Sequence, residues 1–559
     1  MAHTDINRAE HGSYEEHEKA SDDIVHDQQH ESPKYAVVED ERYRFDAADL
    51  DRVQRRLKQR HVQMIAIAGT IGTGLFLGSG GALAAAGPAG TLIAYILVGS
   101  VAYSSLCAVG EMTTHAPISG TFPHFAARWV DPAFGFAVGW NYFYTNCITV
   151  PVEVTAATIL LTFWDSNESH APIYTAVIGA LMCSINIFGV RWFGESEFGF
   201  SLIKISLIIG LILCGLVLDL GGGPDGDRIG FRYWRNPGPF ARANLVPNIG
   251  TDRFLAMITV LVQAAFSFQG MELVAVAASE TENPRRNIKK AVRRVFYRIL
   301  IFYVLGILMI GMLVAYNDER LLRNDGNAHA SPFVIAIDNA GVKGLPHVIN
   351  AAVFTSAFSA GNSFLYCASR ILYGLALRGQ APKIFTYCTK SGLPIAAVIA
   401  SAVPALLSFM NVRENSAQVF DWFVNLTTVG GFFSWWAINI TYLRFRKGMI
   451  LQGFDLKKNV YNNTWQPYVA YWGIFWLTIF ILINGFEVFF DFNGPDFLTS
   501  YLNIPLFLGF FLFWKITKKT KFWRAREMDF VTGIPTIEET ESAEMKPTTL
   551  AGKIAAAIF

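Results

Sequence analysis

The sequence predicts an all-α integral membrane protein with twelve transmembrane helices, and three observations support this fold class. Of 559 residues, 52% are hydrophobic and 16% are charged, whereas an ordinary soluble domain carries about 25% charged residues. The apolar residues are concentrated in residues 61–514, where they form continuous runs rather than the short alternating segments of a β-barrel. The runs are also long enough to cross a bilayer, which takes about 20 apolar residues in a helix.

Twelve apolar segments follow one another within residues 61–514, the predicted membrane domain. They lie near residues 62–86, 91–112, 134–163, 172–190, 198–220, 254–279, 296–316, 347–377, 394–410, 418–443, 468–488 and 498–514. Residues 1–60 are predicted to be a disordered N-terminal tail, because they are acidic and contain no apolar run. Residues 515–559 form the C-terminal tail. Lys and Arg are concentrated in the segments on the N-terminal side of the membrane, so both termini are predicted to be cytosolic.

Two of the apolar segments contain residues that disfavour a continuous helix. Gly69, Gly72 and Gly74 lie in the first segment, and Gly270 lies close to Glu272 in the sixth. A glycine costs a helix interior about 1 kcal/mol relative to alanine, and unwound backbone in a membrane can hold ligand charges on its N–H and C=O groups. The spacing of the two segments is that of an inverted repeat of five plus five helices. The alternative is that these glycines only allow close helix packing.

Three ionisable side chains are predicted to lie inside the membrane, namely Glu153, Lys204 and Glu272. Each costs at least about 2.5 kcal/mol at the centre of a span, so its presence suggests a function. A carboxylic acid in a medium of low dielectric can exchange a proton near neutral pH, as proton coupling requires. The alternative for Lys204 is snorkelling to the cytosolic interface. Glu111, at the end of the second segment, is predicted to form an interfacial salt bridge.

Small polar residues in other segments could line the same cavity, namely Thr145, Ser359, Asn362 and Thr428. The alternative for a Ser or Thr is a hydrogen bond to its own helix. The sequence contains no phosphate-binding, zinc-binding or nucleophilic-triad motif, so we expect neither an enzyme nor a cofactor. The net charge of +1 suggests no nucleic-acid partner.

A series of short passages occurs in a characteristic order along roughly residues 50–530. They are Arg60–Met64, Gly69–Gly74, Gly110–Met112, Pro117–Gly120, Asp131–Phe136, Phe266–Gly270, Glu280–Arg285 and Phe358–Ser363. Together they resemble the fungal amino-acid permeases of the yeast amino acid transporter family, within the amino acid–polyamine–organocation superfamily. The resemblance implies a LeuT-like fold with two inverted five-helix repeats, unwound helices 1 and 6, and two peripheral helices. It also implies a secondary active transporter that imports amino acids across the plasma membrane by proton symport.

The resemblance places substrate binding at the two broken helices. The glycine-rich break in the first helix would bind the substrate carboxylate, and the backbone carbonyls near Ile71 and Phe266 would bind the amine. Phe266 or Phe268 would close the site as an aromatic gate. The substrate-binding candidates are Ile71, Gly72, Thr73, Gly74, Thr145, Phe266, Ser267, Phe268, Ser359, Asn362 and Thr428.

Coupling and selectivity are implied in the same way. Lys204 matches a lysine that stands where sodium-coupled relatives bind sodium, so the implied partner is a proton, with Glu153 and Glu272 as the coupling carboxylates. Loop residues 221–234 resemble the dicarboxylic amino-acid permease branch, but Thr145 and Glu153 replace a lysine and a glutamine of that branch. Because Glu153 has the wrong charge for an acidic substrate, we expect neutral or broad specificity. Acidic amino acids are the second expectation and basic ones the third.

Two other functions remain open on the same fold, a non-transporting amino-acid sensor and a channel. Such sensors tend to carry a much longer cytosolic N-terminal domain, and a channel would not need two broken helices. Lys19 and Lys34 lie in the acidic tail. Permeases of this kind are similar in being ubiquitinated in this tail for endocytosis, which implies a ubiquitin-ligase adaptor as a partner. The alternative is an inert, solvated tail.

Overall fold

The computed structural model describes residues 55, 57–69, 71–165, 167–188, 190–223, 226–322, 331–339, 341–342, 344–412 and 416–542. The predictions for the N-terminal tail, including Lys19 and Lys34, lie outside this part of the chain, as do residues 543–559. Within the described residues the regular structure is helical, apart from one parallel bridge between Leu57 and Thr281. The all-α prediction is therefore confirmed for these residues.

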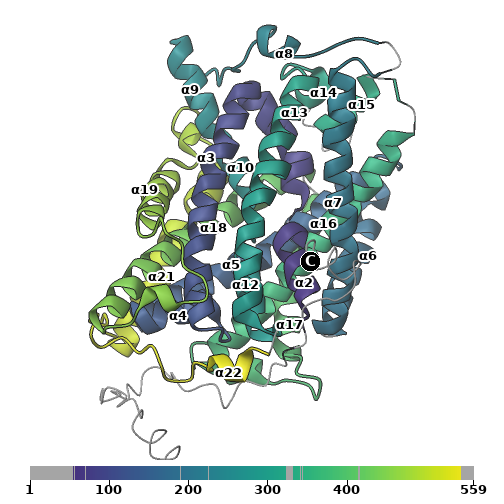
Figure 1. The fold of residues 1–559 in the computed structure, drawn as a ribbon. Coiled ribbons are helices and arrows are strands. Elements are labelled where there is room, and N and C mark those ends of the chain that lie inside the picture. The colour runs from purple at the N-terminus through teal and green to yellow at the C-terminus, as the bar shows by residue number, and fades with distance from the viewer. Residues whose placement is uncertain are drawn as a thin grey trace, which may run out of the picture. The chain divides into compact units, whose positions relative to one another are not determined.

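The helices follow one another along the chain, and Figure 1 labels most of them. Their bounds are α2 (Gln59–Met64), α3 (Ser79–His115), α4 (Thr121–Trp129), α5 (Pro132–Leu161), α6 (Ala171–Ile187), α7 (Val190–Asp219), α8 (Arg232–Arg235), α9 (Ile249–Thr259), α10 (Leu261–Phe268), α11 (Leu273–Val276), α12 (Pro284–Arg298), α13 (Gly306–Leu313), α14 (Glu319–Leu322), α15 (Pro332–Asn339), α16 (Leu345–Leu377), α17 (Ile395–Ala402), α18 (Ser416–Leu451), α19 (Tyr468–Ile483), α20 (Gly494–Tyr501), α21 (Asn503–Lys518) and α22 (Ile537–Thr540).

Seven helices among the described residues are long and apolar enough to cross a membrane. They are Gly74–His115, Pro132–Leu161, Val190–Asp219, Ile249–Glu280, Pro284–Leu313, Leu345–Leu377 and Tyr468–Phe489. The pair α20 and α21, which is bent by 44° at its junction, makes an eighth if it is one span. These lengths support a multi-pass membrane protein.

The helix Gly74–His115 contains a sharp kink at the junction of the first two predicted segments. Gly87 has non-helical backbone angles (φ 74°, ψ 172°) and is followed by Pro88. Proline lacks a backbone N–H and cannot continue the hydrogen-bond ladder of a helix, and glycine tolerates the positive φ. A Cβ at Gly87 would also lie 2.6 Å from the backbone N of Ala241, so only glycine fits there. One helical stretch therefore covers most of two predicted segments.

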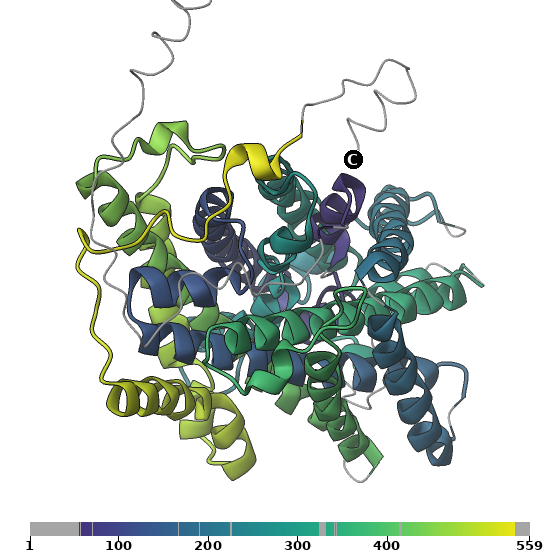
Figure 2. The ribbon, with the colours of Figure 1, turned by 90° about the horizontal axis from the view of Figure 1, so that it is seen from below.

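Helix α5 lies at the centre of the bundle, packed against α4, α16, α18 and α21. Nearly all of its residues are buried, which is why its sequence is apolar on every face rather than amphipathic. In the end-on view of Figure 2, the dark-blue helices of the first third of the chain lie among the green helices of the last third. The core therefore joins segments that are far apart in the sequence.

The segment that follows α21 crosses one end of the bundle, and we call residues 520–542 the C-terminal strap. Arg128 donates to the backbone oxygen of Asp529 at 2.7 Å, and Arg285 donates to that of Pro535 at 2.6 Å. Both arginines are buried, so these carbonyls satisfy donors that water does not reach. The strap, which ends in the yellow helix α22 (Figure 2), thus ties α4 to the start of α12.

Candidate functional site

The first membrane helix is interrupted at its glycine-rich sequence. Helix α2 runs into a π-helical segment, Ile65–Gly69, and Ile71 and Gly72 are not helical. A second π-helical segment, Gly74–Gly78, then leads into α3. Wider π turns depart from the regular i→i−4 hydrogen bonding and are frequent at functional sites. The break lies where the sequence predicted unwinding.

Two glycines let this break contact its neighbours closely. A Cβ at Gly72 would lie 2.7 Å from Oε1 of Glu153 on α5, and a Cβ at Gly74 would lie 2.9 Å from the Cα of Ser267 on α10. Both distances are shorter than real Cβ contacts. The break in the first helix is therefore in direct contact with both α5 and the end of α10.

The sixth predicted segment is broken just after that contact. Helix α10 ends at Phe268, Gln269 has extended backbone angles (φ −58°, ψ 147°), and Gly270 has a φ of 81°. Positive φ is the conformation that glycine adopts at little cost. Glu272 then precedes the short helix α11. The two broken segments thus meet inside the bundle, where Gly74 lies against Ser267.

Glu153 of α5 faces the break in the first helix. The Thr73 hydroxyl donates to Oε2 of Glu153 at 3.1 Å, and the carboxylate is buried, with 2% exposure. A carboxylate that is removed from water needs donors or a positive charge nearby. Here the donor comes from a residue predicted to bind a substrate carboxylate, and the positive charge of Lys204 acts on Glu153 as well.

Lys204 of α7 is fully buried beside a second carboxylate on the same helix, so it does not extend to the interface. Its Nζ lies 3.7 Å from Oε1 of Glu197. Ser359 and Ser363 of α16 donate to Oε2 of Glu197 at 2.7 Å and 3.1 Å. Ser359 is therefore, like Thr73, a predicted substrate residue that donates to a buried carboxylate. The prediction missed Glu197, although its spacing from Lys204, about two helical turns on one face, was a usable signal.

Glu272 has a separate hydrogen-bonding environment. Tyr142 of α5 donates to Oε1 of Glu272 at 2.8 Å, and the indole N–H of Trp435 donates to Oε2 at 3.0 Å. Tyr142 and Glu153 are separated by about 16 Å along α5. The two predicted coupling carboxylates therefore lie at different depths, each with its own donors. Neither Tyr142 nor Trp435 could be selected from the sequence, since buried aromatic residues are common in apolar segments.

Two of the predicted substrate residues make structural hydrogen bonds. The Thr145 hydroxyl donates to the backbone oxygen of Asn141 at 2.8 Å and packs directly against Gly430 of α18. Asn362 accepts from the Asn186 side chain at 2.6 Å. For Thr145 the structure thus shows the hydrogen bond to its own helix that the sequence left open.

Two buried polar atoms near the break in α10 have no hydrogen-bond partner among the described residues. They are Oε1 of Gln269 and the Thr428 hydroxyl oxygen. The amide nitrogen of Gln269 donates to the backbone oxygen of Thr427, the residue before Thr428, at 2.8 Å. A buried polar atom without a partner is costly unless a ligand or water binds to it. Gln269 was not a predicted site residue, although it lies in a passage that carries the resemblance.

The two candidate gate phenylalanines lie in different surroundings. Phe266 contacts Gly74 at the first break and meets Phe420 edge-on at 6.2 Å. Phe268 stacks on Tyr303 at 4.3 Å and is fully buried. Phe266 therefore lies against the break in the first helix, whereas Phe268 packs against Tyr303.

The remaining predicted groups also have partners. Ser267 shares a hydrogen bond of 2.9 Å with the Tyr95 hydroxyl. The carbonyl of Ile71 accepts from the Ser356 hydroxyl at 2.8 Å, which leaves its second lone pair for another donor. Glu111 accepts from the Tyr442 hydroxyl at 2.7 Å and from the backbone N–H of Asn463 at 2.8 Å.

Long apolar helices, two of them broken where they meet buried carboxylates, define a multi-pass membrane protein with the features of a transporter. The family model described as "Amino acid permease" matches residues 61–527. The chain therefore belongs to the amino acid permease family.

Three relatives in this family are named for different substrates. The chain is 44% identical over 502 residues to a proline-specific permease of Emericella nidulans, covering 88% of this chain and 90% of that protein. It is 41% identical over 487 residues to the dicarboxylic amino acid permease of Saccharomyces cerevisiae, covering 86% and 80%. It is also 41% identical over 489 residues to a general amino-acid permease of Candida albicans, covering 86% and 81%. Proteins named for different substrates are thus similar to this chain to nearly the same degree.

Proposed function

We propose that the chain is a secondary active transporter that imports amino acids across the plasma membrane by proton symport. Membership of the amino acid permease family supports amino-acid transport. The proposed architecture has twelve spans in a LeuT-like arrangement of two five-helix repeats and two further helices, with both termini in the cytosol. The kink at Gly87 and the breaks in the first and sixth segments support it.

The observation that carries the proposal is the contact between Glu153 and the break in the first helix. A substrate carboxylate would need the donors of this break, where Thr73 now donates to Glu153. Two ionised carboxylates repel each other strongly in one buried site, so one of them must take up a proton. Protonation of Glu153 would therefore favour substrate binding.

Proton release would then favour substrate release on the other side of the membrane. After the substrate has left, ionised Glu153 would be stabilised by the charge of Lys204 and by the Thr73 hydroxyl. Lys204 is itself held beside Glu197, so its position does not depend on the substrate. One carboxylate at the break corresponds to one proton for each amino acid.

Neutral or broad specificity agrees best with this site. A side-chain carboxylate on the substrate would add a negative charge to a pocket that already contains Glu153, and such a charge is costly without a cation. Acidic amino acids are the second candidate, since the dicarboxylic permease of Saccharomyces cerevisiae is a relative at 41% identity. The unpartnered oxygens of Gln269 and Thr428 would contribute to substrate binding.

The test is an uptake assay in cells that lack their own amino-acid permeases. Radiolabelled neutral, acidic and basic amino acids are compared at two external pH values, with and without a protonophore. We expect neutral amino acids to be taken up best, and the protonophore to abolish accumulation. Glu272→Gln should lose uptake while the amount of protein at the surface is unchanged. Accumulation that requires sodium and resists the protonophore would contradict proton symport.

A further inference from the structure

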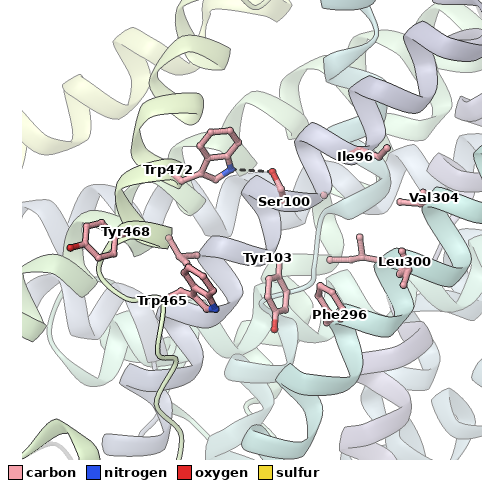
Figure 3. A pocket seen from close by; sticks show the side chains of 12 residues that line it. Ile96, Ser100, Tyr103, Phe296, Leu300, Val304, Trp465, Tyr468 and Trp472 are labelled. Atoms are coloured by element: carbon pink, nitrogen blue, oxygen red, sulfur yellow. Dashed lines mark hydrogen bonds between the residues drawn. The ribbon is translucent and has the colours of Figure 1, made fainter.

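An apolar groove of about 460 Å³ lies on the outside of the bundle between α3, the α12–α13 segment and α19. Figure 3 shows its walls, with Tyr103 of α3 beside Phe296 and Leu300 on one side and Trp465 and Trp472 on the other. None of these residues has been assigned to substrate or proton handling. In a multi-pass membrane protein, this outer face meets lipid.

The interior of the groove offers nothing for a polar ligand. The indole N–H of Trp472 donates to the Ser100 hydroxyl at 3.0 Å, and that hydroxyl donates to the backbone oxygen of Leu97 at 2.7 Å. These polar groups are therefore satisfied within the protein, and the rest of the lining is aliphatic or aromatic. The groove follows the helix from Phe296 to Val304, a distance of roughly 12 Å. Half of the hydrocarbon core of a bilayer is about 15 Å, so the groove matches an acyl chain of one leaflet.

Amphipathic aromatic residues and an exposed positive charge lie at one end of the groove. Trp465 and Tyr468 are 73% and 75% exposed there, and such aromatic residues prefer the membrane–water interface. In Figure 3 the Tyr103 hydroxyl points past Phe296 toward this end. Arg293 lies at this end, about one turn before Phe296 on the same face of α12.

Arg293 is exposed and has no ion-pair partner among the described residues. A guanidinium at the headgroup level of a membrane attracts the phosphate or carboxylate of an anionic lipid. It lies on the end of the bundle that also carries the C-terminal strap, which is the cytosolic end in the proposed orientation. The positive charge of Arg293 therefore favours an anionic lipid over a neutral one in this otherwise apolar groove.

We propose that this groove is a binding site for one anionic phospholipid, with an acyl chain along Leu300 and Val304 and the headgroup on Arg293. The acyl chain of the lipid would also contact Gly99 in the groove wall. The ring of Phe268, at the break in α10, packs against Gly99. The lipid would therefore support the helices that hold the broken segment in place.

The test is native mass spectrometry of the full-length protein in detergent, titrated with phosphatidylserine or with phosphatidylcholine. We expect one tightly bound phosphatidylserine and weaker binding of phosphatidylcholine. Loss of one interfacial charge contact corresponds to about a fivefold change in affinity. Arg293→Gln should therefore weaken phosphatidylserine binding about fivefold, without weakening phosphatidylcholine binding. Lys447→Gln, which removes an exposed charge on α18, is the matched control and should change neither.

A second pair of variants tests the acyl-chain part of the site. Leu300→Trp fills the groove, whereas Ile301→Trp places the same side chain on a neighbouring residue that is 40% exposed and outside the groove. Only Leu300→Trp should abolish lipid binding, and both proteins should stay monodisperse. Equal affinity for the two phospholipids, no retained lipid, or a bound sterol that Leu300→Trp removes would each overturn the proposal.

Discussion

Replacing Glu153 by glutamine should uncouple transport from the proton gradient. The amide keeps the size of the side chain and can still bond to the Thr73 hydroxyl, which lies 3.1 Å from the carboxylate, but it cannot take up and release a proton. In the proposed mechanism Glu153 is the carboxylate at the break in the first helix, and one proton moves with each substrate. A pH difference of one unit is worth about 1.36 kcal/mol for one proton, or tenfold in concentration.

The assay uses proteoliposomes with an imposed gradient of two pH units and no membrane potential. The unaltered protein should then accumulate its substrate up to about 100-fold, because each unit contributes a factor of about ten. Glu153→Gln should equilibrate the substrate without accumulation, while exchange of labelled for unlabelled substrate continues. Glu111→Gln is the matched control, since Glu111 is a buried carboxylate bonded to Tyr442 and remote in sequence from both breaks. Gradient-driven accumulation by Glu153→Gln would refute the assignment of Glu153.

The remaining predictions concern packing, the strap and the tail. Gly74→Ala should abolish uptake, because its Cβ would lie 2.9 Å from the backbone of Ser267, whereas Gly78→Ala, with no atom within 4 Å, should not; uptake relative to surface protein decides this. Arg128→Ala should destabilise the protein by about 3 kcal/mol, since it removes the donor to the Thr532 carbonyl and the ion-pair partner of the Asp529 carboxylate, and a melting curve measures the loss. Burial is the largest single effect and raises the pKa of Asp529, but the charge of Arg128 and the hydrogen bonds from Val531 and Thr532 together outweigh it and lower the pKa below its ordinary value. This contribution to stability is therefore present at neutral pH and is lost as the pH falls below about 4, and Asp529→Asn should remove that part of the acid dependence of the melting temperature. Lys19→Arg combined with Lys34→Arg should slow substrate-induced turnover of the protein, and unchanged turnover would exclude these lysines as ubiquitination sites.

Several features of the site followed from local sequence. The glycines at positions 72, 74 and 270 predicted where helices break, because a glycine weakens a helix wherever the fold later places it. Glu153, Lys204 and Glu272 could be selected as buried ions, since a charge inside a long apolar segment is costly and is rarely kept there without a function. The helical class followed from the continuous apolar runs of about 20 residues, because a helix of that length crosses the bilayer and satisfies its backbone hydrogen bonds within the segment.

Which of these residues act together depended on the tertiary structure. Nothing in the sequence joins Thr73 to Glu153 or Glu197 to Ser359, since these pairs come from different helices and meet only through packing. The same packing brings Phe266 to the first break and Phe268 onto the ring of Tyr303. It also leaves the Gln269 and Thr428 oxygens without partners among the described residues. Insertion into a membrane requires properties of each segment alone, and these can be recognised in the sequence. A binding site requires the relative positions of several segments, which arise from side-chain contacts between distant parts of the chain.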